Sequence, residues 1–226
     1  MTKPWLTFDC YDTLIRYSEN KAAVLADLVR SKGGDETAIT AAQKAFEASE
    51  RKLQLGEFMT LNAVLRSSLH TALTTVAFNT TKADEETIID AVKNAEPFPD
   101  VRASLADLKH DHRLAVISNS EPDIIRHNIQ AINVEFDAVV LATQAKCYKP
   151  NPRMFFALLA RINEIAENVT HIAQSFYHDM RTSRDLGFGR RIWINRYGRI
   201  SDPAYSPDAE LPNLYNLRNF LLNLRE

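Results

Sequence analysis

The chain contains 226 residues, of which 45% are hydrophobic and 25% charged, and its formal net charge is -2. This length fits one large domain, or a core with a smaller insert. The near-neutral charge gives no indication of a nucleic acid or an anionic membrane as partner. No apolar run is long enough to span a bilayer, and no signal peptide fits before the first expected strand. Two cysteines, Cys10 and Cys147, form no disulfide framework, so we expect a cytoplasmic protein.

The N-terminal part of the sequence predicts one strand followed by four helices. Residues 5–9 form a short apolar run that ends at Asp9 and is followed by a polar turn. From residue 18 the apolar positions follow helical spacing until a pair of glycines ends the helix. Further helices are expected over residues 35–55, 61–78 (with Thr60 as N-cap) and 84–95.

After Pro97 and Pro99, which break any helix, strands and helices alternate. Continuous apolar runs, which suit parallel strands covered on both faces, predict strands at 113–118, 138–141, 171–175 and 191–195. Helices are expected to end near residue 110 and to cover 122–131, 152–162, 180–186 and 213–224. Alternation implies right-handed βαβ units and a parallel sheet flanked by helices. We therefore predict an α/β core of residues 1–15 and 98–226, with residues 16–97 inserted after the first strand as a helical cap.

Polar side chains follow the expected strands at four places. They are Asp9 with Thr13, Ser118 with Asn119, Lys149, and Asp179 after Ser175. In a parallel sheet these should meet in one crevice beyond the carboxyl ends of the strands. Each alone has a plain structural explanation, since Ser118 or Asp179 can cap a helix and most lysines are solvated. As an ordered set they favour a single catalytic site.

The set resembles the four motifs of the haloacid dehalogenase superfamily, over nearly the whole chain. The matching segments are Asp9-Cys10-Tyr11-Asp12-Thr13-Leu14, Ser118-Asn119-Ser120, Tyr148-Lys149-Pro150 and Ala173-Gln174-Ser175-Phe176-Tyr177-His178-Asp179. The chain is most similar to the type II, or L-2-haloacid, dehalogenases, because Tyr11 stands where the phosphatase branch carries an acid. The resemblance implies a Rossmann-like core with a helical cap, a small-molecule substrate, no cofactor, no metal, and a homodimer as in related dehalogenases.

The resemblance also implies a covalent reaction. Asp9 would attack a substrate carbon and form an ester, and Lys149 would keep Asp9 ionised. Thr13 and Ser118 would orient carboxylates by hydrogen bonds, and Asp179 would help to activate water. Substrate contacts are expected from Cys10 and Tyr11, through their backbone amides, and from Asn119, Ser175 and Phe176.

Some positions depart from this branch, and they concern substrate binding. Alanines occupy the region of the usual cap arginine, near residues 41–42, and Arg51 is the nearest arginine downstream. Phe155 replaces a tyrosine, Phe176 an asparagine and Asp12 a glycine. The catalytic residues are therefore kept while those that would bind a haloacid are changed.

Two hydrolytic reactions remain open. One is dehalogenation of a small 2-substituted carboxylic acid with a different carboxylate anchor, and the other acts on a non-halogenated substrate such as the strained ring of azetidine-2-carboxylate. A metal-dependent phosphatase is disfavoured because Tyr11 and Ser175 occupy positions where that branch has acids. A non-catalytic binding module is disfavoured because the whole catalytic set is present.

Other residues near the motifs have simpler interpretations. His171 falls in an expected strand and is interpreted as a buried core histidine, and His178 as a packing or substrate contact. The Cys10 side chain should point away from Asp9 if the strand geometry continues. Aromatic residues around the motifs could wall an apolar pocket that excludes water; they are Tyr11, Tyr17, Phe58, Phe155, Phe176 and Tyr177.

Overall fold

The computed structural model describes residues 3–223, and its central feature is a parallel sheet of six strands within that range. The strand order is β3-β2-β1-β4-β5-β6, and every neighbouring pair is parallel. The strands are β1 Trp5–Phe8, β2 Arg113–Ser118, β3 Ala138–Leu141, β4 Val169–Ala173, β5 Arg190–Ile194 and β6 Ala209–Leu211. The order reverses between β1 and β4. Ligands bind beyond the carboxyl ends of strands at such a reversal, so the topology locates a site there.

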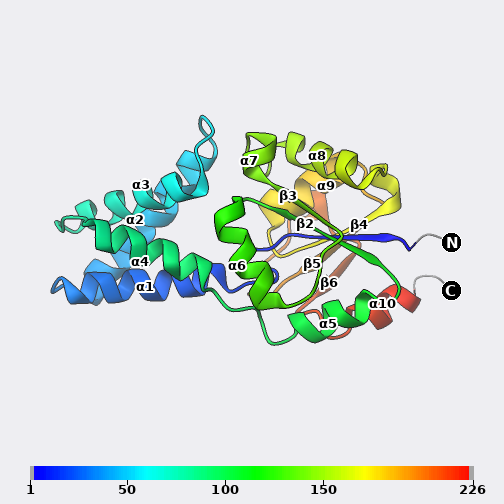
Figure 1. Ribbon diagram of the computed structural model, residues 1–226, viewed down its shortest axis with the longest axis horizontal. Helices are drawn as coiled ribbons and strands as arrows, with labels where there is room; N and C mark the ends of the chain where they lie inside the picture. The colour runs from blue at the N-terminus through cyan, green and yellow to red at the C-terminus, as the bar shows by residue number, and fades with distance from the viewer. Residues whose placement is uncertain (1–2, 224–226) are drawn as a thin grey trace.

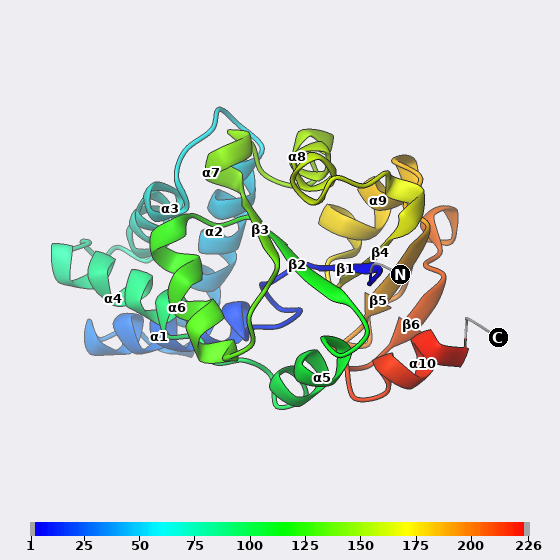
Figure 2. The same ribbon diagram turned by 45° about the vertical axis from the view of Figure 1, so that its right-hand side comes forward.

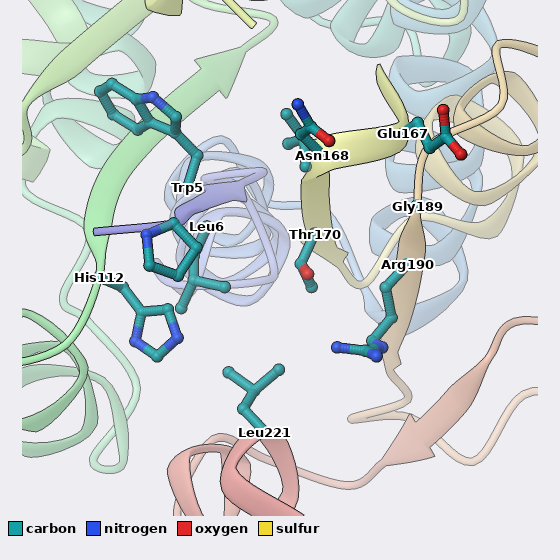
Figure 3. A pocket seen from close by; sticks show the side chains of 11 residues that line it. Trp5, Leu6, His112, Glu167, Asn168, Thr170, Gly189, Arg190 and Leu221 are labelled. Atoms are coloured by element: carbon teal, nitrogen blue, oxygen red, sulfur yellow. The ribbon is translucent and has the colours of Figure 1, made fainter. Parts of the chain in front are cut away.

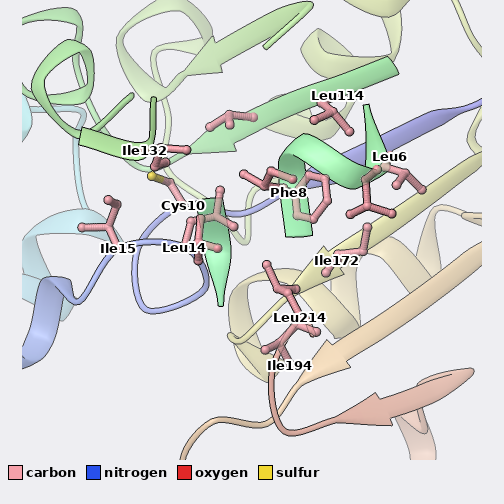
Figure 4. Packing of buried hydrophobic residues seen from close by; sticks show 14 of the residues in the cluster. Leu6, Phe8, Cys10, Leu14, Ile15, Leu114, Ile132, Ile172, Ile194 and Leu214 are labelled. Atoms are coloured by element: carbon pink, nitrogen blue, oxygen red, sulfur yellow. The ribbon is translucent and has the colours of Figure 1, made fainter. Parts of the chain in front are cut away.

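Helices cover both faces of the sheet (Figure 1). One face carries α5 (Val101–Leu108), α6 (Pro122–Ile132) and α10 (Leu217–Asn223), and the other carries α7 (Ala142–Ala145), α8 (Pro152–Ile162) and α9 (Arg181–Asp185). Leu6 and Phe8 pack with the first set of helices and Trp5 packs with α8, as strand alternation requires. Figure 4 shows the first of these two cores. Burial on both faces explains why the strands appear in the sequence as continuous apolar runs.

The other four helices lie beyond the carboxyl ends of the strands (Figures 1 and 2), and we call them the cap helices. They are α1 (Tyr17–Ser31), α2 (Glu36–Gln54), α3 (Leu61–Thr75) and α4 (Lys82–Lys93). They have their own apolar cluster, which Ile124 of α6 joins. The side chains of Asp35, Thr60 and Thr81 accept hydrogen bonds from the first turns of α2, α3 and α4, which fixes where these helices begin.

The chain enters and leaves the cap helices through two segments that are hydrogen-bonded to each other. The amide of Phe98 donates to Leu14 O and that of Arg16 to Glu96 O, both at 3.0 Å. An antiparallel bridge joins Ile15 and Pro97 between these bonds. We call residues 14–16 and 96–98 the hinge segments.

The predicted fold class is confirmed: the chain is an α/β protein with a parallel sheet flanked by helices. Within the described residues no helix is long and apolar enough to cross a bilayer. The sequence did not reveal β6 or the short α7, and it placed β4 two residues late. The last helix begins at Leu217 instead of residue 213, and residue 224, its predicted end, lies outside the described residues. A π-helical turn, Phe176–Met180, precedes α9, and Ser175 caps it, so Asp179 is not an N-cap.

Candidate active site

Asp9 follows β1 directly, and the loop after it fixes the orientation of its carboxylate. The amide of Asp9 donates to Ile172 O of β4 at 3.1 Å, which places it at the reversal of strand order. The Thr13 hydroxyl donates to Asp9 Oδ2 at 2.6 Å and accepts from the Gln174 amide at 2.8 Å. The predicted role of Thr13 as an orienting residue therefore agrees with its contacts.

Lys149 lies between two carboxylates. Its Nζ is 2.7 Å from Asp9 Oδ1, 2.8 Å from Asp179 Oδ1 and 3.2 Å from Ile117 O, and the side chain is 2% exposed. Asn119 fixes the backbone of this lysine, because its Oδ1 accepts from Lys149 N at 2.7 Å and its Nδ2 donates to Lys149 O at 3.1 Å. Loops after β1, β2, β3 and β4 thus converge on one ammonium group.

Asp179 is fully buried and is held by a histidine as well as by Lys149. His171 Nε2 lies 3.0 Å from Asp179 Oδ1, and His171 Nδ1 lies 2.9 Å from Thr7 Oγ1. Because a carboxylate can only accept, Nε2 must carry the proton. Asp179 Oδ2 is buried and bonds to no group that the structure describes.

The three charged groups shift one another's pKa values. Burial raises the pKa of Asp9 in spite of the nearby Lys149, so Asp9 is a more basic carboxylate than a solvated one. Burial acts in the same direction on Asp179, but Lys149 and His171 outweigh it and lower the pKa of Asp179 to about 2. Burial disfavours the ammonium of Lys149, yet the two carboxylates raise its pKa above the ordinary value. The lysine therefore stays charged, and Asp9 is the better nucleophile of the two acids.

A cavity of about 300 Å³ opens beside these groups, between the sheet edge and the cap helices. Asp9, Lys149, Asp179 and Asn119 line it from the core. The residues that line it from α1 and α2 are mainly polar: Tyr17, Lys21, Glu47, Glu50, Arg51 and Gln54. The cavity is therefore charged rather than apolar. Of the six aromatic residues expected to wall it, only Tyr11 and Tyr17 do so, with their rings stacked at 4.2 Å.

Tyr11 and Ser175, from which substrate contacts are expected, also line this cavity. The Tyr11 hydroxyl lies 2.6 Å from Ser120 Oγ, and the Ser175 hydroxyl accepts from the His178 amide at 3.0 Å. Asp12, at the position of the usual glycine, has a φ of 61°. Its carboxylate accepts from Ser18 N and Ser18 Oγ at the start of α1. This local bonding compensates for the left-handed backbone that glycine adopts more easily.

Ser118 and Phe176 are placed differently from expectation, whereas the Cys10 side chain points into the core, as expected. Ser118 Oγ is buried and makes no hydrogen bond to the described part of the chain, so it orients neither Asp9 nor Asp179. The Cys10 side chain lies in the core beside Ile132 (Figure 4), so only its backbone could reach substrate. Phe176 packs edge-on against Trp193 at 5.1 Å and does not line the cavity.

Sequence reasoning missed His171 and Arg51 as members of the site. His171 is a buried histidine of β4, as expected, and it is also paired in register with Thr7 and holds Asp179. Its position two residues before the end of β4, facing Thr7, is a signal that becomes visible only once the strands are aligned. Arg51 lines the cavity from α2 and makes no ion pair with the residues described here. The sequence did not predict this placement, because Arg51 lies downstream of residues 41–42, where the usual cap arginine is expected.

The oxygen donors at this site do not fit a magnesium ion. Asp9 and Asp179 each give one oxygen to the ammonium of Lys149. The positions that could supply a further carboxylate hold Tyr11 and Ser175, and Asp12 is engaged by Ser18. Magnesium requires a nearly octahedral set of oxygen ligands, and these side chains do not provide one.

A second cavity, of about 260 Å³, lies at the opposite edge of the sheet, near the amino ends of β1, β4 and β5 (Figure 3). Trp5, His112, Thr170 and Arg190 are among its lining residues. None of the predicted catalytic residues lines this second cavity, whereas Asp9, Lys149 and Asp179 line the cavity at the carboxyl ends.

Comparison with known proteins agrees with this architecture. The family model of haloacid dehalogenase-like hydrolases matches residues 5–187. L-2-haloacid dehalogenase from Xanthobacter autotrophicus superposes with a TM-score of 0.82 at 18% identity, over 99% of this chain and 100% of that one. The magnesium-bound HAD-hydrolase YfnB from Bacillus subtilis superposes with a TM-score of 0.83 at 16% identity, over 98% and 100%. Identities this low show a shared fold alone.

Among curated sequences, phosphoserine phosphatase from Thermus thermophilus is 28% identical over 120 residues, 52% of this chain and 48% of that protein. The chain thus spans about half the length of this relative. The family match covers most of the chain and includes every strand end that contributes to the site. The chain therefore belongs to the haloacid dehalogenase-like hydrolases.

Proposed function

We propose that this hydrolase uses Asp9 to displace a leaving group from carbon 2 of a small 2-substituted carboxylic acid, through an ester intermediate. The observation that carries the proposal is the contact of Lys149 Nζ with both Asp9 and Asp179, in a site whose donors do not suit magnesium. A buried, oriented carboxylate with a raised pKa is suited to attack at carbon.

The carboxylate of the substrate would be held by Arg51. This guanidinium lines the cavity from the cap side, opposite Asp9 and Asp179, and has no protein carboxylate as partner among the described residues. A carboxylate bound there would place carbon 2 between Arg51 and Asp9. Asn119 serves instead to fix Lys149, since both ends of its amide bond to the backbone of that lysine.

A specific observation also favours the non-halogenated alternative. Glu47 and Glu50 line the same cavity as Arg51. Glu50 is bonded to Tyr17 and Lys21, whereas no hydrogen bond or ion pair joins Glu47 to a described residue. Azetidine-2-carboxylate carries an ammonium group beside its carboxylate. In this cavity its carboxylate would bind Arg51 and its ammonium group would bind Glu47.

The test is to incubate the purified protein with L-2-chloropropionate and measure chloride, and with azetidine-2-carboxylate and measure ring opening by mass spectrometry. Asp9→Asn should abolish product, and Asp185→Asn, an exposed carboxylate on α9, is the matched control that should retain it. Product formed by Asp9→Asn at the wild-type rate would contradict the proposal. So would magnesium-dependent release of phosphate from p-nitrophenyl phosphate in the absence of either expected product.

The proposed binding of the substrate carboxylate by Arg51 is tested separately. Arg51→Met should raise KM for the productive acid about 10- to 100-fold, the equivalent of one charged hydrogen-bonded contact of about 1.5–3 kcal/mol. Arg161→Met, at an exposed arginine in the last turn of α8, should leave KM unchanged. Equal KM values for the two variants would remove Arg51 from the binding site.

A further inference from the structure

The His178 imidazole forms part of the cavity wall. Its backbone belongs to the π-helical turn after β4, and its amide is fixed by the Ser175 hydroxyl at 3.0 Å. No hydrogen bond joins its ring to another group in the part of the chain that the structure describes. The ring therefore offers one nitrogen donor and one nitrogen acceptor to a molecule in the cavity.

Charged groups from the core and from the cap helices both act on this ring. Burial has the largest effect and lowers the pKa of His178 to about 4, with Asp179 and Glu50 opposing the shift and Lys149 and Arg51 reinforcing it. His178 is neutral at pH 7 for this reason. His178 lines the same cavity as Asp9, Asp179 and the α2 residues Glu50 and Arg51.

We propose that His178 is the base that takes the proton from water when the ester on Asp9 is hydrolysed. This inference rests on the proposed function. Lys149 and His171 both bond to Asp179 Oδ1 and lower the pKa of Asp179 to about 2, which makes Asp179 a weaker base than His178. Once Asp9 is an ester it has no charge, and Lys149 is then paired with Asp179 alone. Phe176, at the position of the family's asparagine, packs on Trp193 and offers no polar group.

The oxygen of water forms a bond to Cγ of the Asp9 ester while one proton passes to the ring nitrogen of His178. The tetrahedral intermediate collapses and breaks the bond between Cγ and the ester oxygen, which leaves with the substrate carbon as an alkoxide. His178 returns its proton to the alkoxide to give the hydroxy acid. The new Asp9 carboxyl group loses the second water proton to solvent. Asp179 Oδ2 would accept a hydrogen bond from the attacking water.

The experiment follows the covalent state of Asp9 by intact-protein mass spectrometry after rapid quenching, with L-2-chloropropionate and azetidine-2-carboxylate as probes. In His178→Gln, ester should form in the first turnover and then accumulate, because its hydrolysis is slowed about 10²- to 10⁴-fold. Wild-type protein should show no comparable build-up. In His178→Ala, added imidazole should restore turnover, an effect that a purely structural role for the ring would not produce.

Two results would overturn the role of His178. One is a folded His178→Gln variant that turns over at the wild-type rate without adduct. The other is a folded variant that forms neither adduct nor product, which would assign His178 to the first step. Wild-type protein that never yields adduct or product would instead overturn the proposed function, and the role of His178 with it.

Discussion

Replacing Lys149 by methionine tests how much its ammonium group stabilises the folded protein by pairing with two buried carboxylates. The substitution keeps most of the side-chain volume and removes an ammonium that lies 2.7 Å from Asp9 and 2.8 Å from Asp179. Removing one partner of a buried ion pair leaves an unpaired buried charge and lowers the free energy of unfolding by about 3–5 kcal/mol. For a chain of this length we expect the midpoint of thermal unfolding to fall by about 10 °C at pH 7, at about 2–4 °C for each kcal/mol.

The loss of stability in Lys149→Met should increase as the pH rises. Without the ammonium, two buried carboxylates face each other, and the pKa of at least one rises above its value in the unfolded chain. A raised carboxyl pKa stabilises the folded state at low pH, and that contribution disappears as pH rises through the folded pKa. The difference between wild type and variant should therefore be small near pH 4 and grow toward pH 7.

Urea denaturation at several pH values, followed by circular dichroism, measures this difference. Lys21→Met is the matched control, since Lys21 is also buried but pairs with one carboxylate, Glu50, which keeps a bond from Tyr17. It should lose less stability than Lys149→Met. Parallel wild-type and Lys149→Met stabilities at every pH would refute the reasoning.

Two further substitutions test the supports of the loop that follows Asp9. Thr13→Val removes the hydroxyl that donates to Asp9 and accepts from a backbone amide, and should lower the free energy of unfolding in urea by about 1–3 kcal/mol. Asp100→Asn breaks a buried bidentate pair with Arg196, whose guanidinium also bonds to Thr13 O, and should cost about 3 kcal/mol by the same measurement. Asp202→Asn, in the more exposed pair with Arg181, should cost under about 1 kcal/mol, and an equal loss in both variants would contradict this ranking.

The sequence predicted those features that depend on local pattern. Continuous apolar runs located the buried strands, and N-cap residues such as Thr60 located helix starts. Asp9, Thr13 and Lys149 were predicted to meet because each follows a strand of one parallel sheet, and the structure brings them within hydrogen-bond distance.

The features that could not be predicted depend on contacts between distant segments. β6 spans three residues with no apolar run, and it forms only because β5 offers it a free edge. The bond from His171 to Asp179 requires the register of β1 against β4. Arg51 reaches the cavity because α2 packs beside α1 and α3, an arrangement that the sequence spacing does not encode.

The hinge segments have a consequence for how such a protein can change over generations. Leu14 and Phe98 are joined by a 3.0 Å hydrogen bond, so the residues where the chain departs for the cap helices and comes back are immediate neighbours. A stretch of DNA inserted or deleted between their codons would leave every strand of the sheet, and Asp9, Lys149 and Asp179, in the encoded chain. The residues that line the cavity from α1 and α2 can therefore change in sequence independently of these three side chains.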